Sequence, residues 1–351
     1  NNKIGGEGGY AIGTNSTWNE LVEFHANGNN FGDRGAQSIG NNYSWPKLKE
    51  LHLSNNGIDD EGGAAIGMSY AWGELKLLEI SMNSLGKKSA EAIGNNTHWR
   101  KLRKLWMQNN NIPDEGGTAI GSNKTWTRLE ELDLSNNYLG DRSAQAIGSN
   151  KVWENLKKFA LSFNKVSDEG GEVLGMNSCW HLLEVFECKM NAVGNKTAKA
   201  IAENKTWNHL KILDLSDNRI DDEGAIEFAG QVSWVNIQQL RLSGNPISDH
   251  AVFYRKSNPI WRNEALVFDL PQRKGKYLTD QVSDSMVDLD FENQQLISSQ
   301  ILILTGASTT EPSTTTETST NWKNLKKFSL WNKKIGDKGC EAIGNNTTWT
   351  S

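Results

Sequence analysis

Apolar residues recur along the chain at a fixed interval of 27 residues, and tryptophan marks this repeat most clearly. The tryptophans are Trp18, Trp45, Trp72, Trp99, Trp126, Trp153, Trp180, Trp207, Trp234 and Trp261 and, after a break, Trp322 and Trp349. A fixed period of this length indicates a solenoid, in which each unit buries its apolar face only by stacking on its neighbours. We therefore expect one elongated domain rather than separate globules.

Within each unit the apolar pattern changes from that of a strand to that of a helix. Leu51 and Leu53 alternate with polar residues, which predicts a short strand with one face in the core. The segment that follows, Asp-Glu-Gly-Gly-x-Ala-Ile-Gly, begins with acidic residues and ends in glycine and asparagine, which predicts a helix of about three turns. Because strands stack at about 4.8 Å and helices need about 8–10 Å, the stack must curve.

The repeated pattern W-x-x-L-x-x-L-x-L-S-x-N-x-I resembles the leucine-rich repeat. Its positions are shown most clearly by Trp45, Leu48, Leu51, Leu53, Ser54, Asn56 and Ile58. The long helical half of each unit is similar to the ribonuclease-inhibitor-like subclass. The resemblance implies an α/β solenoid, a curved arc with a parallel β-sheet on the concave face and helices on the convex face. It does not imply inhibition of a ribonuclease, because one fold hosts many binding roles.

The repeat pattern also predicts how the chain is organised. The predicted segments are regular repeats over 1–247, irregular repeats or a C-terminal cap over 248–308, a Thr/Ser-rich linker over 309–321 and a terminal repeat over 322–351. Within the irregular segment, 265–270, 286–291 and 300–304 have the composition of strands. A cap is a common need of solenoids, because the last repeat would otherwise expose its core.

Two residue types that recur once per repeat, a tryptophan and an asparagine, are interpreted as structural. The tryptophans are expected to form a buried spine. One asparagine per repeat is expected to form a ladder of hydrogen bonds to backbone groups left open where the chain leaves each strand. The ladder residues are Asn29, Asn56, Asn83, Asn110, Asn137, Asn164, Asn191, Asn218 and Asn245.

Candidate protein-binding residues lie on the predicted inner face of the sheet. Trp106 is a large aromatic residue expected to face solvent, and clustered aromatics and methionines are typical of interfaces. The full candidate set is Trp106, Met82, Phe163, Met190, His52, Glu79 and Asp133. The alternative is that the apolar members are scattered surface residues, which are common.

Catalytic and metal chemistry are not expected. His25, His52 and Glu79 line up on adjacent strands, but a spacing of about 4.8 Å separates the first from the third by about 10 Å, too far for one ion. The chain contains no H-E-x-x-H, C-x-x-C or G-x-S-x-G motif and no phosphate-binding loop. We expect neither an enzyme, nor a cofactor, nor a metal.

Charge and composition restrict the partners. The net charge of −5 argues against a nucleic-acid partner, which usually requires a basic surface. No apolar run approaches the roughly 18 residues of a membrane span. The three cysteines indicate no disulfide framework. The expected partner is another protein or a second copy of the chain.

Two carbohydrate-like patterns favour an extracellular location. Glycosylation sequons begin at Asn15, Asn42, Asn95, Asn123, Asn195, Asn204, Asn345 and Asn346. The stretch 309–320 is rich in threonine, serine and proline, as O-glycosylated stalks and linkers are. The alternative interpretation is that asparagine caps the helix and threonine suits the turn, in which case a cytoplasmic location remains open.

These patterns predict a non-catalytic protein-interaction or structural scaffold that acts through its concave sheet or by head-to-tail self-association. A terminal repeat on a linker could stack on the open first repeat of the next molecule. The alternatives are a subunit of an extracellular glycosylated filament and a cytosolic regulator that binds a protein inside its arc.

Overall fold

A computed structural model of the chain describes residues 3–230, 233–248, 267–269, 288–290 and 327–329. The chain divides into two compact units, Asn1–Pro271 and Gln272–Ser351. The ladder asparagines and the candidate inner-face residues all belong to the first unit. In the second unit, strand β11 (Asp288–Asp290) pairs in parallel with β12 (Lys327–Ser329).

The first unit contains one continuous parallel sheet with its strands in chain order. Equivalent residues of successive repeats lie side by side in it, as His25 and His52 do. The strands are β1 (Glu23–His25), β2 (Glu50–His52), β3 (Leu77–Glu79), β4 (Lys104–Trp106), β5 (Glu131–Asp133), β6 (Lys158–Ala160), β7 (Val185–Glu187), β8 (Ile212–Asp214), β9 (Gln239–Arg241) and β10 (Val267–Asp269). From β2 to β9 the middle residue of each strand is buried, because alternate side chains point to opposite faces.

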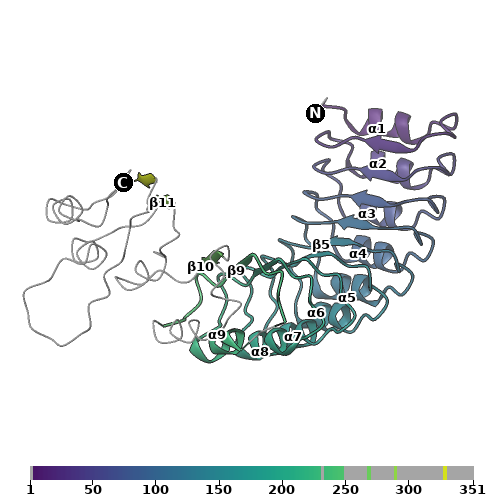
Figure 1. The fold of residues 1–351 in the computed structure, drawn as a ribbon. Helices are drawn as coiled ribbons and strands as arrows, with labels where there is room; N and C mark the ends of the chain where they lie inside the picture. Colours follow the sequence, from purple (N-terminus) through teal and green to yellow (C-terminus); the bar gives the residue numbers. More distant parts are fainter. Residues whose placement is uncertain (1–2, 231–232, 249–266, 270–287, 291–326, 330–351) are drawn as a thin grey trace, which may run out of the picture. The chain divides into compact units, whose positions relative to one another are not determined.

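A short helix follows each strand from β1 to β8, and another precedes β1. The helices are α1 (Gly6–Gly13), α2 (Gly32–Gly40), α3 (Asp60–Gly67), α4 (Lys87–Gly94), α5 (Asp114–Ser122), α6 (Asp141–Gly148), α7 (Asp168–Gly175), α8 (Asn195–Glu203) and α9 (Asp222–Ala229). In Figure 1 helices α5 to α9 lie on the outer side of the curve and strands β5, β9 and β10 on its inner side. This confirms the predicted solenoid. The helices have eight or nine residues, little more than two turns rather than three.

Neighbouring helices pack very closely at glycine. A Cβ atom on Gly121 of α5 would lie 2.6 Å from the backbone nitrogen of Ile147 in α6, which is a steric clash. The glycine near the end of the helix is therefore a packing requirement as well as a helix-ending residue.

The acidic residue at the start of most helices caps the helix of the next repeat. The carboxylate of Asp114 in α5 accepts hydrogen bonds from the backbone N–H groups of Gly140 and Ser143 at the start of α6, and from the Ser143 hydroxyl. Asp60 and Asp168 lie two repeats before and two repeats after Asp114. Each accepts equivalent hydrogen bonds from the start of the helix that follows its own. These carboxylates fasten adjacent repeats together, in addition to the favourable helix dipole.

The tryptophans form a buried spine in the described repeats after the first. Trp45, Trp72, Trp99, Trp126, Trp153, Trp180, Trp207 and Trp234 are each at most 1% exposed. Several stack in pairs, for example Trp126 and Trp153, whose ring centroids lie 6.5 Å apart. Trp18 differs, because it is 40% exposed. Trp261, Trp322 and Trp349 lie outside the described residues.

The strand-exit asparagines bridge the backbone of two consecutive repeats. The amide nitrogen of Asn137 donates to the carbonyl oxygens of Met107 and Leu134, at 3.1 and 3.0 Å. Its carbonyl oxygen accepts from the backbone N–H of Ile112. The same pattern recurs through the column, so each side chain satisfies buried backbone groups of its own and the preceding repeat.

A second asparagine column lies after most of the described helices, and it includes four of the sequon asparagines, Asn15, Asn42, Asn123 and Asn204. The amide nitrogen of Asn123, which is 5% exposed, donates to the carbonyl oxygens of Gly94 and Asn96 in the preceding repeat. Asn42 and Asn204 are buried in the same way. Attachment of a glycan requires a free side-chain amide nitrogen with open space around it. The amide nitrogens of these three residues are hydrogen-bonded and buried. The interpretation of Asn42, Asn123 and Asn204 as glycan acceptors is therefore corrected to a structural role.

The remaining sequons differ in environment. Asn95 is exposed, whereas Asn15 and Asn195 are half-buried, and the amide nitrogen of Asn195 donates to Asp221. Asn345 and Asn346 lie outside the described residues.

The predicted boundaries after residue 247 fall mostly outside the described residues. Within the segment 248–308, β10 continues the first sheet by pairing with β9, and β11 lies inside the expected strand 286–291. The predicted strand 300–304, the linker 309–321 and most of the terminal repeat 322–351 are not among the residues that the structure describes. Within residues 3–230 and 233–248, no helix has the length and apolar character of a membrane span.

Candidate functional site

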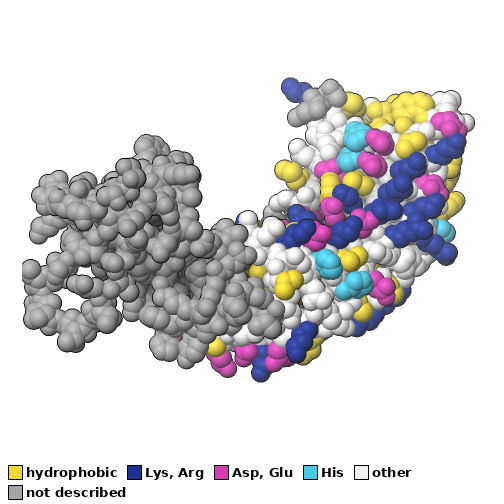
Figure 2. All heavy atoms as spheres, viewed as in Figure 1, with side chains coloured by type: hydrophobic (Ala, Val, Ile, Leu, Met, Phe, Trp, Pro, Cys, Tyr) yellow, Lys and Arg dark blue, Asp and Glu magenta, His cyan; other side chains and the backbone are white. Residues whose placement is uncertain are grey.

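The inner face of the sheet has two outward-pointing residues per strand, and these include acidic, basic and apolar side chains. Pairs of opposite charge connect neighbouring strands: Lys104 with Glu131 at 2.7 Å, Lys158 with Glu187 at 3.7 Å and Arg241 with Asp214 at 3.2 Å. Figure 2 shows basic and acidic side chains next to one another on the visible surface of the repeats. Such a surface suits selective contact with a protein rather than binding to a polyanion.

At the N-terminal end of this face, His52 and Glu79 form a hydrogen-bonded pair. Nδ1 of His52 lies 2.5 Å from Oε2 of Glu79, and Glu79 also accepts hydrogen bonds from the side chains of Asn27 and Ser54. Burial raises the pKa of Glu79, but the hydrogen bonds that it accepts outweigh burial and hold the pKa below its ordinary value. Glu79 is therefore an ionised carboxylate that orients the His52 ring.

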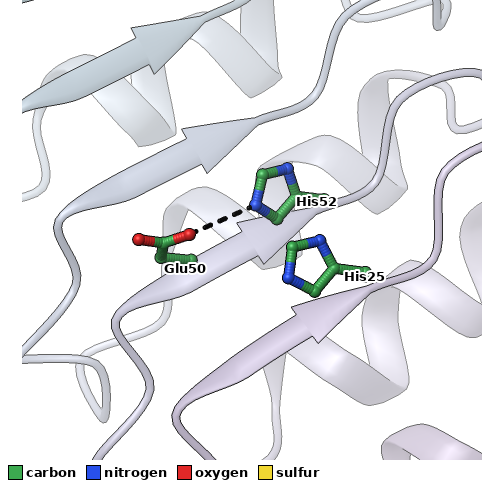
Figure 3. A group of neighbouring side chains, drawn as sticks. All are labelled: His25, Glu50 and His52. Carbon is green, nitrogen blue, oxygen red and sulfur yellow. Dashed lines mark ion pairs between the residues drawn. The ribbon is translucent and has the colours of Figure 1, made fainter.

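His52 also lies close to two groups on its other side. Its ring stacks on that of His25, with centroids 4.2 Å apart, and its Nε2 lies 3.6 Å from Oε2 of Glu50 (Figure 3). The sequence placed Glu79 in one column with His25 and His52, and Glu50 was not predicted to join this group. Glu50 lies two residues before His52 on the same strand, and that i, i+2 spacing was the available indication.

Trp106 and Asp133 line a shallow pocket of about 230 Å³ near the middle of the face. Gln108, Glu131, Leu132 and Lys158 complete it. Trp106 is half-buried rather than fully exposed, and the Lys104 ammonium lies over its ring, 5.6 Å from the centroid. The pocket thus combines an aromatic wall with groups of both charges.

Met82, Phe163 and Met190 occupy a column just beyond the strands, and all three are exposed, at 56, 45 and 44%. Phe163 and Met190 belong to adjacent repeats, whereas Met82 is three repeats away from Phe163. Every member of this column has a positive φ: Gly28, Asn55, Met82, Asn109, Asn136, Phe163, Met190, Asp217 and Gly244. We call these residues the left-handed column.

The described repeats contain two cysteines, and one of them is an inert core residue. Cys188 is buried, and burial raises the pKa of its thiol to about 12, so the thiolate nucleophile is not formed near neutral pH. Cys179 is half-buried and is also a free thiol.

Comparison with known proteins agrees with the fold. Five segments match the family model described as Leucine Rich repeat: residues 46–67, 98–121, 127–148, 154–175 and 208–229. The matched segments are leucine-rich repeats, and the sheet and helices of the first unit have the solenoid architecture that such repeats form. No curated protein matches this chain.

Solved structures with similar folds come from both plants and bacteria. The ectodomain of the Arabidopsis receptor kinase HAESA, in complex with an extended IDA peptide hormone, is 20% identical over 72% of this chain and 39% of its own, with a TM-score of 0.46. A plant ice-binding protein is 20% identical over 65% of each chain, with a TM-score of 0.40. An internalin from Listeria monocytogenes is 18% identical over 74% of this chain and 76% of its own, with a TM-score of 0.44. Similarity at this level carries no weight for function.

Proposed function

We propose that the chain is a non-catalytic protein-binding scaffold that holds a protein or peptide segment against the inner face of its sheet, between Trp106 and Met190. Leucine-rich repeats are usually binding modules without catalytic activity, which supports this class. Within the leucine-rich repeats we assign the chain to the ribonuclease-inhibitor-like subclass, because each repeat from α1 to α9 carries a true helix of eight or nine residues.

The left-handed column is the observation that carries the proposal. A positive φ is costly for residues with bulky side chains, and glycine, asparagine and aspartate adopt it most readily. Six of the nine positions hold one of those three residue types, but Met82, Phe163 and Met190 do not. Local backbone strain of this kind concentrates at binding and catalytic sites. These three exposed apolar side chains occupy a backbone conformation that disfavours them, which supports a role in contact with a binding partner.

The Trp106 pocket supplies a second anchor on the same sheet. An aromatic wall beside groups of both charges matches the composition of interface centres, in which tryptophan and methionine are enriched. We infer a partner segment with apolar anchors flanked by polar residues. Phe163 and Met190 would hold one apolar side chain, and Trp106 would contact another.

Peptide-display selection on the intact chain tests the proposal. Peptides selected on the wild type would be measured by calorimetry against Phe163→Asn, Met190→Asn and Trp106→Ala. Asparagine is the native residue at Asn109 and Asn136 in the same column, so the two asparagine variants should keep the fold while removing the apolar contact. We expect at least a tenfold loss of affinity, about 1.4 kcal/mol, for each variant at the centre of the interface.

Met176→Asn is the matched control, because Met176 is also an exposed apolar residue but follows helix α7 on the other side of the repeat. It should bind the selected peptides as the wild type does. Selected peptides that bind all three inner-face variants with unchanged affinity would show that the binding surface lies elsewhere.

The extracellular location and the filament alternative rest on the Thr/Ser-rich segment 309–320 and on the exposed sequon at Asn95, since Asn42, Asn123 and Asn204 are structural. We keep the extracellular location as a proposal, and glycan mapping of the native protein by mass spectrometry tests it.

Self-association through the terminal repeat is tested by deleting residues 309–351. An unchanged mass by light scattering would exclude it.

A further inference from the structure

A cluster of two histidines and a glutamate on strands β1 and β2 has the donor groups of a metal site. One ligand atom each from His25, Glu50 and His52 can be chosen so that all lie within 4.8 Å of one another. Figure 3 shows the two imidazole rings side by side, with the Glu50 carboxylate facing the edge of the His52 ring. Two imidazole nitrogens and one carboxylate form a recurrent donor set for Zn²⁺ that leaves a fourth position open.

The hydrogen bonding of His52 determines which of its nitrogens is available. Its Nδ1 contacts the ionised carboxylate of Glu79, which requires a hydrogen on Nδ1. In the neutral ring Nε2 then carries a lone pair. This Nε2 atom is buried and makes no hydrogen bond within the described residues. A carboxylate that orients a histidine through its other nitrogen is the usual support of a histidine metal ligand.

The lone pair of Nε2 faces a negative group, and this arrangement needs a positive charge between them. Oε2 of Glu50 lies 3.6 Å from Nε2 of His52, too far for a normal hydrogen bond. Two acceptors facing each other in a half-buried site repel. Either a proton on Nε2 or a metal ion removes the repulsion, and only the metal ion also uses the stacked His25.

We propose that His25, Glu50 and His52 bind a divalent transition-metal ion of the Zn²⁺ type, with Glu79 as the positioning residue for His52. Ligand atoms in a tetrahedral site with bonds of about 2.0–2.1 Å lie about 3.4 Å apart, so the side chains must close in slightly. The side chains of His25 and Glu50 are 59 and 38% exposed and have room to do so. The open position of the ion would face the inner side of the sheet. This differs from the expectation of no metal, which considered only the column from His25 to Glu79.

Zinc titration of the intact chain by calorimetry tests the site, with Co²⁺ absorption as the second readout. We expect one ion per chain and a tetrahedral Co²⁺ spectrum. His25→Asn, Glu50→Gln and His52→Asn should each raise the dissociation constant at least about tenfold. Glu79→Gln should raise it about 10–100-fold through loss of orientation, while the Co²⁺ spectrum stays tetrahedral at saturating metal.

His98→Asn and Glu187→Gln are the matched controls. His98 lies near the helix ends, and Glu187 occupies the column of Glu79 four repeats away. Both should bind Zn²⁺ as the wild type does, and circular dichroism should show that every variant is folded. A wild type that takes up no stoichiometric Zn²⁺, or uptake unchanged by the three ligand variants, would overturn the proposal. A shared proton on His52 would then explain the cluster.

Discussion

Two places in the repeat differ in how narrowly the fold restricts the residue type. In the loop after each helix, from Asn123 to Trp126 and its equivalents, a buried asparagine and a buried tryptophan recur through most of the described repeats. In the left-handed column the backbone conformation recurs, but the residue type does not. Both places lie at element ends and both make hydrogen bonds to a neighbouring repeat. The left-handed column does so through its backbone N–H, as Asn136 does with Ser162, and the loop after the helix does so through its asparagine side chain.

The contrast separates structural requirement from function. The helix-exit loop needs an amide with both a donor and an acceptor in a space closed by tryptophan, and few other residues satisfy it. The left-handed column needs only a backbone conformation, and its side chain points into solvent. Phe163 and Met190 adopt a positive φ that their side chains disfavour, and the fold does not require these side chains. Contact with a binding partner would explain why they are present.

The largest effect is expected from truncating the tryptophan of the loop. Trp126→Ala should lower the free energy of unfolding by about 3–5 kcal/mol, because it leaves a cavity in the spine. Trp18→Ala is the comparison, since Trp18 is 40% exposed and should cost much less. Urea denaturation followed by circular dichroism measures both. Equal losses in the two variants would contradict the buried-spine account.

Removing the buried asparagine of the same loop should have the next largest effect. Asn123→Ala leaves the carbonyl oxygens of Gly94 and Asn96 and the N–H of Thr125 without their partner. Each unsatisfied buried group costs about 1–3 kcal/mol, so we expect a loss of at least about 2 kcal/mol in the same denaturation assay. In a secretory host, any glycan should map to Asn95 and none to Asn123. Occupancy at Asn123 would refute the structural role.

A smaller and pH-dependent effect is expected at the caps between repeats. Burial raises the pKa of Asp114, but its hydrogen bonds from helix α6 outweigh burial and lower the pKa below its ordinary value. The folded-state pKa is thus below the unfolded value of about 3.9, so the carboxylate stabilises the fold above that pH and this contribution is lost as the pH falls through the folded-state pKa.

Asp114→Asn should therefore lower the free energy of unfolding by about 1 kcal/mol at neutral pH. The variant should also lose less stability than the wild type when the pH falls below about 4. Thermal unfolding between neutral and acidic pH measures this. Asn195 occupies the equivalent position in α8, so the fold itself accepts asparagine there. A variant with the same pH profile as the wild type would show that Asp114 is not the titrating cap.

The smallest effect is expected in the left-handed column, and it has the opposite sign. Phe163→Asn should raise the stability by up to about 1 kcal/mol, because asparagine adopts a positive φ more readily. A thermal shift measures the change, and Asn136→Phe is the reciprocal variant, which should destabilise by a similar amount. A loss of stability in Phe163→Asn would mean that the phenylalanine is a packing residue rather than a contact residue.

Repetition made the fold predictable from sequence. The alternation of Leu51 and Leu53 indicated the strands, and the same spacing in every unit required them to stack in register. The sequence could not show that the sequon asparagines Asn42 and Asn123 point into the stack. A sequon and a buried turn share the same Asn-x-Thr pattern, and only the position of the preceding repeat distinguishes them.

The sequence by itself determined the period, the alternation of strand and helix and the residues of the inner face, because these depend on spacing along the chain. Only the tertiary structure decided which neighbours each residue contacts across the repeat boundary. Asp114 caps the next helix rather than its own. Glu50 lies diagonal to His25, and Phe163 shares a positive φ with glycines and asparagines far away in sequence. These relations depend on the register and curvature of stacked repeats, which no local pattern contains.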